Sequence, residues 1–205
     1  MEFQELELKY FVNDLGRIEE KIIREGAQNV QPRILEINLR FDTPDNRLSQ
    51  SGKVLRLRFD TQTHLTYKGP SQSQEGIRLR EEIEFIADNF QAAKAFLIAL
   101  GYQISMIYEK YRTTYVLNDV HIMLDELPYG KFVEIEGPSP EKILYINELL
   151  GLDWQRRVPE SYAILFERLR HQKILPFRDL VFDNFKDLPI NADDLEIQAA
   201  DQSIG

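Results

Sequence analysis

Period-two alternation of apolar and polar residues runs through most of the first 137 residues, and it constrains the fold more than any other feature. In the first such segment, Leu6, Leu8 and Tyr10 alternate with charged residues. Alternation at this period is typical of a β-strand with one apolar and one polar face. It predicts strands over residues 3–11, 33–42, 53–60, 64–69, 77–87, 106–117, 119–126 and 131–137.

The links between these segments indicate how the strands pair. Between Lys53 and Phe85, and again between Met106 and Gly137, the links are too short for a parallel crossover. We therefore expect mostly antiparallel pairing. Many antiparallel strands with few helices predict an α+β fold, namely an eight-stranded antiparallel β-barrel with about four flanking helices.

The helices are predicted from capping residues and from the spacing of apolar residues. The sequence Ser139-Pro140, for example, supplies an N-cap and a first-turn proline. The predicted helices run from Asn13 or Asp14 to Gly26, from Asp88 to Gly101, from Ser139 to Gly151, and from about Pro159 to Gln172.

Composition excludes several classes of protein. The 205 residues include no cysteine, which excludes disulfides, thiolate metal sites and cysteine nucleophiles. There is no apolar run of about 18 residues, and the N-terminal sequence lacks the features of a signal peptide. The net charge of −9 argues against duplex nucleic acid as a partner. We expect a cytoplasmic protein without membrane association, present as a monomer or homodimer.

The last part of the chain differs from the rest. Residues 1–175 contain the predicted strands and helices, whereas residues 176–205 form an acidic tail. We expect this tail to be partly packed or disordered. Its Phe177, Leu180 and Phe185 favour packing onto the body, and the polar stretch from Ile190 is predicted to be mobile.

The polar face of the strands is rich in charge. Its basic side chains are Lys9, Arg56, Arg58, Lys68, Arg78, Arg80, Lys110 and Arg112. Its acidic side chains are Glu5, Glu7, Glu82, Glu84, Asp125, Glu134 and Glu136. For a single strand, a solvated outer face is the simpler interpretation. For all strands together, an inward face is favoured, and charges enclosed in a barrel must pair or hold charged ligands.

A ligand for such a lining must pair with both the basic and the acidic side chains. Arginine and lysine bind phosphate oxygens, and paired carboxylates suit a hard cation such as Mg²⁺ or Mn²⁺. A metal-bound polyphosphate would engage both sets. The histidines, at positions 64, 121 and 171, are scattered, so a zinc site or a His-based catalytic site is not expected. No glycine-rich phosphate loop is present, so side chains would hold the phosphates.

Short motifs in a fixed order carry a family resemblance. The run Glu5-Leu6-Glu7-Leu8-Lys9 resembles the E-x-E-x-K signature of the CYTH superfamily, the triphosphate tunnel metalloenzymes. In family order there follow FDTPDNRL (41–48), LRLR (55–58), TYKGP (66–70), REEIE (80–84), EKYR (109–112), LDELPYGKFVEIEG (124–137) and Ser161-Tyr162. The resemblance covers roughly residues 1–170 and is closest to the class IV adenylate cyclase or thiamine-triphosphatase-like branch.

The resemblance implies that residues 1–175 form a tunnel that binds triphosphate. By motif position, the phosphate ligands would be Lys9, Arg56, Arg58, Lys68, Arg80, Lys110 and Arg112. The metal ligands or their supports would be Glu5, Glu7, Glu82, Glu84, Asp125, Glu134 and Glu136. Glu5, Glu7, Lys9 and Lys68 would be catalytic.

Other positions lead to weaker expectations. Where the family commonly has a tyrosine before FDTP, this chain has Arg40, which we place at the tunnel mouth. The loop Gly69–Gly76 is small and polar and needs no function of its own. Tyr108 is expected in the core or on the barrel exterior.

Three functions remain open at this point. The first is a metal-dependent triphosphatase acting on inorganic triphosphate or on an organic one such as ATP or thiamine triphosphate. The second is an adenylate cyclase that converts ATP to cyclic AMP and pyrophosphate. The third is a non-catalytic binder of polyphosphate or nucleotide, which the many carboxylates disfavour. We rank the triphosphatase slightly ahead.

Overall fold

The structure is a computed structural model that describes residues 4–201. Its strands are β1 (Gln4–Val12), β2 (Gln28–Asp42), β3 (Val54–Phe59), β4 (Thr63–Lys68), β5 (Gln72–Gln74), β6 (Ile77–Ala87), β7 (Gln103–Leu117), β8 (Val120–Leu127) and β9 (Gly130–Glu136). Its α-helices are α1 (Leu15–Arg24), α2 (Arg47–Gln50), α3 (Phe90–Ala99), α4 (Pro140–Leu150) and α5 (Tyr162–Lys173). Its 3-10 helices are η1 (Trp154–Arg156), η2 (Phe182–Phe185) and η3 (Asp193–Leu195).

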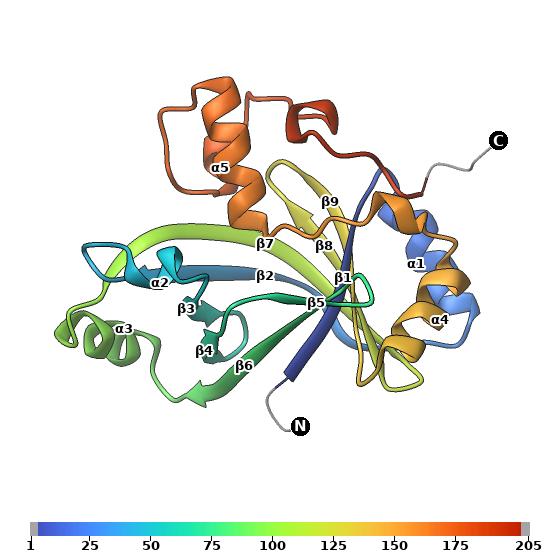
Figure 1. Ribbon diagram of the computed structural model, residues 1–205, viewed down its shortest axis with the longest axis horizontal. Coiled ribbons are helices and arrows are strands. Elements are labelled where there is room, and N and C mark those ends of the chain that lie inside the picture. Colours follow the sequence, from blue (N-terminus) through green and yellow to red (C-terminus); the bar gives the residue numbers. More distant parts are fainter. Residues whose placement is uncertain (1–3, 202–205) are drawn as a thin grey trace.

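The strands close into an antiparallel barrel, as predicted (Figure 1). Their order is β1-β9-β8-β7-β2-β3-β4-β6, and β1 pairs again with β6 to complete the ring. The short strand β5 pairs with the start of β6. It lies in the loop Gly69–Gly76, where the sequence analysis expected no regular structure.

The strand register places oppositely charged residues side by side. Glu5 lies across from Arg80 on β6, and Lys9 lies across from Glu134 on β9. Because side chains alternate between the two faces of a strand, the charged set points into the barrel and the apolar set points outward.

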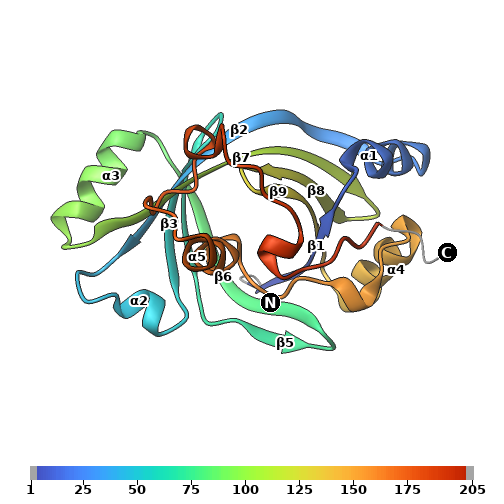
Figure 2. The same cartoon turned by 90° about the horizontal axis from the view of Figure 1, so that it is seen from above.

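Helices bury much of the apolar outer face of the barrel, although Ile83 and Phe85 of β6 remain 38% and 56% exposed. Ile22 of α1 and Ile146 of α4 are fully buried in one cluster with Val133 and Ile135 of β9. On the opposite side, Leu97 of α3 packs in a cluster with residues of β2 and β3. Figure 2 shows α1 and α4 at one end of the molecule, α2 and α3 at the other, and α5 viewed end-on between them. The apolar core thus lies between the barrel and the helices. This leaves the interior of the barrel free for polar side chains.

The helix starts follow the predicted capping logic with small shifts. The side chains of Asp14, Asn89 and Ser139 each accept a hydrogen bond from a backbone N–H in the first turn of α1, α3 and α4. The fourth predicted helix, α5, begins at Tyr162 instead of Pro159, because Ser161 is its N-cap. No helix in residues 4–201 is long and apolar enough to cross a bilayer.

Two segments are more ordered than the sequence indicated. Helix α2 begins at Arg47, near the end of FDTPDNRL, and continues to Gln50. Asp42 organises this segment by accepting hydrogen bonds from the backbone N–H groups of Leu48 and Ser49. Strand β2 begins five residues earlier than expected. Its first part contains Pro32 and register shifts against β7, which hide the alternation.

The acidic tail packs along most of its described length. Leu180 pairs with β7, donating its N–H to the Ile107 carbonyl at 2.9 Å and accepting the Glu109 N–H at 2.9 Å. Further on, Leu195 and Ala200 are buried, so the mobility predicted from Ile190 onward is wrong for residues 190–201. The predicted mobile stretch also includes residues 202–205, which lie outside the described residues.

Candidate active site

The barrel encloses a cavity of about 310 Å³. Its charged lining is Glu5, Glu7, Lys9, Arg40, Arg56, Arg58, Lys68, Arg78, Arg80, Glu82, Glu84, Lys110, Arg112, Glu134 and Glu136. Every residue proposed from the sequence as a phosphate, metal or catalytic group lines this cavity, with Asp125 as the exception. Their ligand roles remain predictions, but the structure brings the side chains together.

Asp125 lies behind the lining and is fully buried. Its carboxylate accepts hydrogen bonds from Lys110 Nζ at 2.9 Å and from Arg112 Nε and Nη2 at 2.6 Å each. The Tyr162 hydroxyl donates a further bond to it at 2.8 Å. A carboxylate so surrounded is suited to positioning Lys110 and Arg112 rather than to binding a metal in the cavity.

Glu36 of β2 is a second buried carboxylate, and it was not among the residues predicted from the sequence. It lies 3.6 Å from Lys110 Nζ and 3.7 Å from Arg58 Nη1. Burial alone would raise its pKa, but Lys110, Arg112 and Arg58 outweigh that effect and lower the pKa to about 2. The signal was present in the sequence, because Glu36 alternates with Ile37 and Leu35 and shares the inward face with Arg40.

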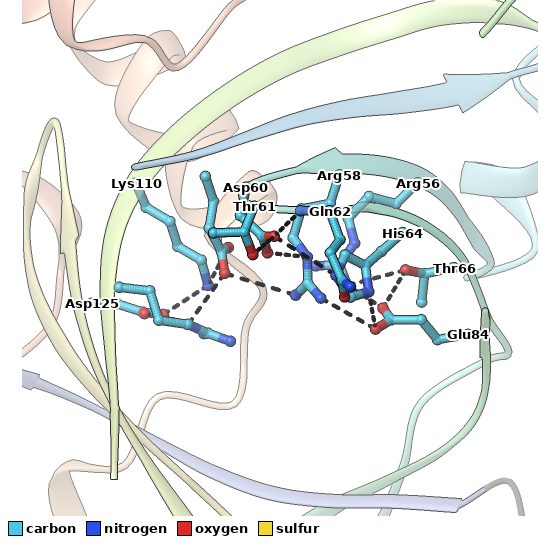
Figure 3. Close-up of polar contacts among 12 residues, drawn as sticks. Arg56, Arg58, Asp60, Thr61, Gln62, His64, Thr66, Glu84, Lys110 and Asp125 are labelled. Atoms are coloured by element: carbon cyan, nitrogen blue, oxygen red, sulfur yellow. Dashed lines mark hydrogen bonds and ion pairs between the residues drawn. The ribbon is translucent and has the colours of Figure 1, made fainter. Parts of the chain in front are cut away.

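Glu84 contacts two arginines, a threonine and a histidine (Figure 3). It lies 3.2 Å from Arg58 Nη2 and 3.3 Å from Arg56 Nη2, and it accepts the Thr66 hydroxyl at 2.6 Å. Burial favours the neutral acid, but these groups together lower the pKa of Glu84. His64, to which the sequence assigned no role, also contacts Glu84 at 3.0 Å. Glu84 is thus an anchor that orients both arginines.

Four carboxylates of the lining lie near one another. Lys68 Nζ lies 2.7 Å from Glu5 and 3.1 Å from Glu82, and Arg78 Nη1 lies 2.8 Å from Glu7. Burial, together with the nearby Glu5, Glu82 and Glu7, raises the pKa of Glu136 to about 8. We call Glu5, Glu7, Glu82 and Glu136 the acidic group.

The acidic group fits a divalent cation by its chemistry. Among the described residues, the buried Glu5 Oε2 has no hydrogen-bond partner, and burial together with the neighbouring carboxylates raises the pKa of Glu136. Both conditions would be relieved by a hard cation with oxygen ligands. In residues 4–201, however, no three acidic or histidine side chains are already arranged to hold a metal ion.

Lys9 contacts two carboxylates of the lining and one aromatic ring. Its Nζ lies 3.1 Å from Glu134 and 3.7 Å from Glu7, and 4.3 Å from the centre of the Tyr162 ring. Arg112 also contacts Glu134. This network fixes Lys9 within the lining, where a phosphate oxygen can replace a carboxylate as its partner.

Arg80 and Arg40 are restrained differently. Arg80 donates to the Gly69 carbonyl at 2.6 and 3.0 Å, so backbone oxygens fix its guanidinium. Arg40, expected at the tunnel mouth, belongs to the cavity lining.

The cavity also contains groups to which the sequence analysis gave no role. Tyr108, Ser161 and Tyr162 all line it. The Tyr108 hydroxyl lies 3.4 Å from Arg56 Nη1, while its side chain also packs against the apolar cluster of Leu180 and Phe185, so the expected core position is confirmed in part. Its spacing of two from Lys110 was the available signal. No strand pattern could have placed Tyr162, because it enters from α5.

Comparison with known proteins identifies the family. A family model for the CYTH domain matches residues 4–146, which is more than half of the chain. The protein belongs to the CYTH domain family. None of the curated proteins matches this CYTH protein.

Solved structures share its fold. A provisionally assigned adenylate cyclase from Vibrio parahaemolyticus is 22% identical with a TM-score of 0.72, and the match covers 80% of this chain and 98% of that one. The PH1819 protein of Pyrococcus horikoshii OT3 is 28% identical with a TM-score of 0.66, over 80% and 98% of the two chains. A provisionally assigned adenylyl cyclase from Hippeastrum, which has a dominant triphosphatase activity, is 18% identical with a TM-score of 0.60, over 80% and 95%.

Proposed function

We propose that this CYTH protein is a divalent-metal-dependent triphosphatase that hydrolyses a triphosphate bound in the barrel. The observation that carries the proposal is the presence of both signs of charge in one cavity. Nine cationic side chains line it together with the acidic group, whose members lie near one another. A triphosphate chain needs the former, and the cation that accompanies it needs the latter.

The basic residues would act on the substrate before and during bond cleavage. Arg56, Arg58, Lys110 and Arg112 are held in place by the buried or half-buried carboxylates of Glu84, Glu36 and Asp125. Charged donors fixed in this way need little reorganisation when negative charge shifts along the phosphate chain. Transition-state stabilisation of phosphoryl transfer depends chiefly on such positioning.

The acidic group would bind Mg²⁺ or Mn²⁺, with Glu5 and Glu7 closest among the ligands. When bound, the cation would neutralise phosphate charge and lower the pKa of water. The role of these residues is then to supply oxygen ligands. Lys68, 2.7 Å from Glu5, is positioned to contact a phosphate next to this site.

The Glu7→Gln variant tests the assignment of the acidic group. We expect it to lose at least a hundredfold in kcat, because one anionic ligand is removed while the shape of the side chain is kept. Circular dichroism should show that the barrel remains folded. Unchanged turnover in the variant would refute the role given to Glu7.

A panel of substrates tests the reaction itself. Inorganic triphosphate, ATP and thiamine triphosphate would each be incubated with Mg²⁺ or Mn²⁺ and assayed for phosphate, pyrophosphate and cyclic AMP. Release of phosphate without cyclic AMP supports the triphosphatase. Cyclic AMP with an equal amount of pyrophosphate would instead identify a cyclase, the second candidate, which is favoured by the fold shared with provisionally assigned cyclases.

The third candidate is a non-catalytic binder of polyphosphate or nucleotide. It would be supported if triphosphate raised the melting temperature while no substrate in the panel was turned over. The acidic group counts against it, because binding phosphate alone would be opposed by carboxylates at the same cavity.

A further inference from the structure

A second cavity, of about 260 Å³, adjoins the barrel cavity. Glu7, Lys9 and Arg78 belong to the lining of both. The remaining walls are the β5–β6 hairpin and the segment from Arg157 to Pro159. We call this second cavity the side pocket.

The side pocket lies where the pairing partner of β1 changes. β1 pairs with β6 only as far as Glu7, and beyond that point Val158 donates its N–H to the Lys9 carbonyl at 2.7 Å. The hairpin turn rests on η1, where a Cβ on Gly76 would come within 2.8 Å of the Trp154 ring. Gly76, at φ +81°, therefore permits the close contact that shapes the pocket.

Arg157 is the side chain that decides what this pocket accepts. Its guanidinium carbon lies 4.4 Å from the centre of the Trp154 ring, and Nη1 donates to the Trp154 carbonyl at 2.8 Å. Among the residues that the structure describes, no carboxylate forms an ion pair with it, whereas Arg58, Arg78 and Arg112 of the barrel cavity each contact at least one. The result is a flat cation supported on one side by an indole ring and lining a cavity.

Resting on the proposed function, we propose that the side pocket binds the planar heterocycle of a nucleoside triphosphate, stacked on Arg157, while its phosphates occupy the barrel cavity. Guanidinium planes stack on neutral aromatic rings and are attracted to their π faces. Leu8 and Val158 offer apolar surface, and Ser71 and Ser73 offer polar groups for the ring edges.

The same charge disfavours thiamine. Its thiazolium ring carries a permanent positive charge, which Arg157 would repel. Inorganic triphosphate leaves the pocket empty. The order of affinity expected from the side pocket is therefore ATP above thiamine triphosphate, with inorganic triphosphate insensitive to changes at Arg157.

The fluorescence of Trp154 gives a direct test, since it is the single tryptophan of the chain. ATP and inorganic triphosphate are titrated without divalent cation, so that neither is turned over, and calorimetry gives each Kd. We expect ATP, but not triphosphate, to change the Trp154 emission. We expect Arg157→Ala and Arg157→Lys to weaken ATP binding about tenfold and triphosphate binding less than twofold.

Arg157→Lys keeps the positive charge but removes the planar guanidinium, so it separates stacking from charge. Arg24→Ala, on the exposed face of α1, is the control that removes one positive charge away from the side pocket. Equal weakening of both ligands, or ATP binding that Arg157→Lys leaves unchanged, would overturn the side-pocket proposal alone. If neither ligand binds the wild-type protein either without divalent cation or after Mg²⁺ is added, the triphosphate site itself is refuted as well.

Discussion

Glu36 and Asp125 show how single buried carboxylates hold the cationic lining in place. Each is at most 1% exposed, and each touches Lys110 and Arg112. Isolated charges at such depth would be strongly unfavourable, so the two carboxylates and the cations in front of them form one interdependent unit. Changes at these residues should therefore affect both stability and phosphate binding.

At the residue scale, Glu36 predicts a specific acid sensitivity. Its pKa is about 2 in the folded protein, against an ordinary value of 4.5. A lowered pKa stabilises the fold fully above pH 4.5, and that contribution is lost as the pH falls towards 2. The linkage amounts to about 3 kcal/mol. Denaturant unfolding of wild type and Glu36→Gln between pH 7 and 2.5 should show a smaller pH dependence in the variant, and parallel curves would contradict it.

At the element scale, strand β7 reveals why the tail is ordered. β8 pairs with β7 from Tyr111 onward, which leaves the edge of β7 before Tyr111 unpaired by β8. Leu180 hydrogen-bonds to this edge, and Phe182 donates its N–H to the Glu109 carboxylate at 3.0 Å. An exposed strand edge is open to pairing, and here the chain covers it with its own tail.

This arrangement predicts that Leu180→Ala costs about 2 to 5 kcal/mol, the range for a fully buried leucine. The amide of Glu109, bonded to Leu180, should exchange with solvent faster in the variant. Leu100→Ala is the matched control, since Leu100 is 59% exposed and should change stability by less than 0.5 kcal/mol. A Glu109 amide that is protected as well in the variant as in the wild type would show that the tail does not support β7.

The elements also show how far sequence reasoning reaches. The alternation of apolar and polar residues predicted the barrel strands. The positions of Lys9 and Arg112 within that alternation predicted that their side chains point inward. Both predictions depend only on the pleat of a single strand. The position of Tyr162 depends on where α5 crosses the barrel, and the order of the tail depends on an edge left free by β8. Contacts between elements distant in sequence leave no periodic signal, so these features required the structure.

At the scale of the whole molecule, the chain has a net negative charge, whereas its cavity has more basic than acidic side chains. The protein carries −9 overall, yet its barrel cavity is lined by nine basic and six acidic side chains. The basic side chains therefore attract a phosphate chain, while the acidic group repels it until a cation is present. Binding of the anion and of the cation should be coupled, and thermodynamic linkage requires that each strengthen the other equally.

The last prediction measures this coupling. Melting temperatures would be recorded with triphosphate, with Mg²⁺, and with both, and converted to apparent affinities by mass action. We expect Mg²⁺ to tighten triphosphate binding at least tenfold. In Glu5→Gln the coupling should fall below threefold, because the carboxylate with the unpartnered oxygen is neutralised, whereas exposed Glu20→Gln should retain it. Strictly additive shifts in the wild-type protein would mean that cation and phosphates do not share one site.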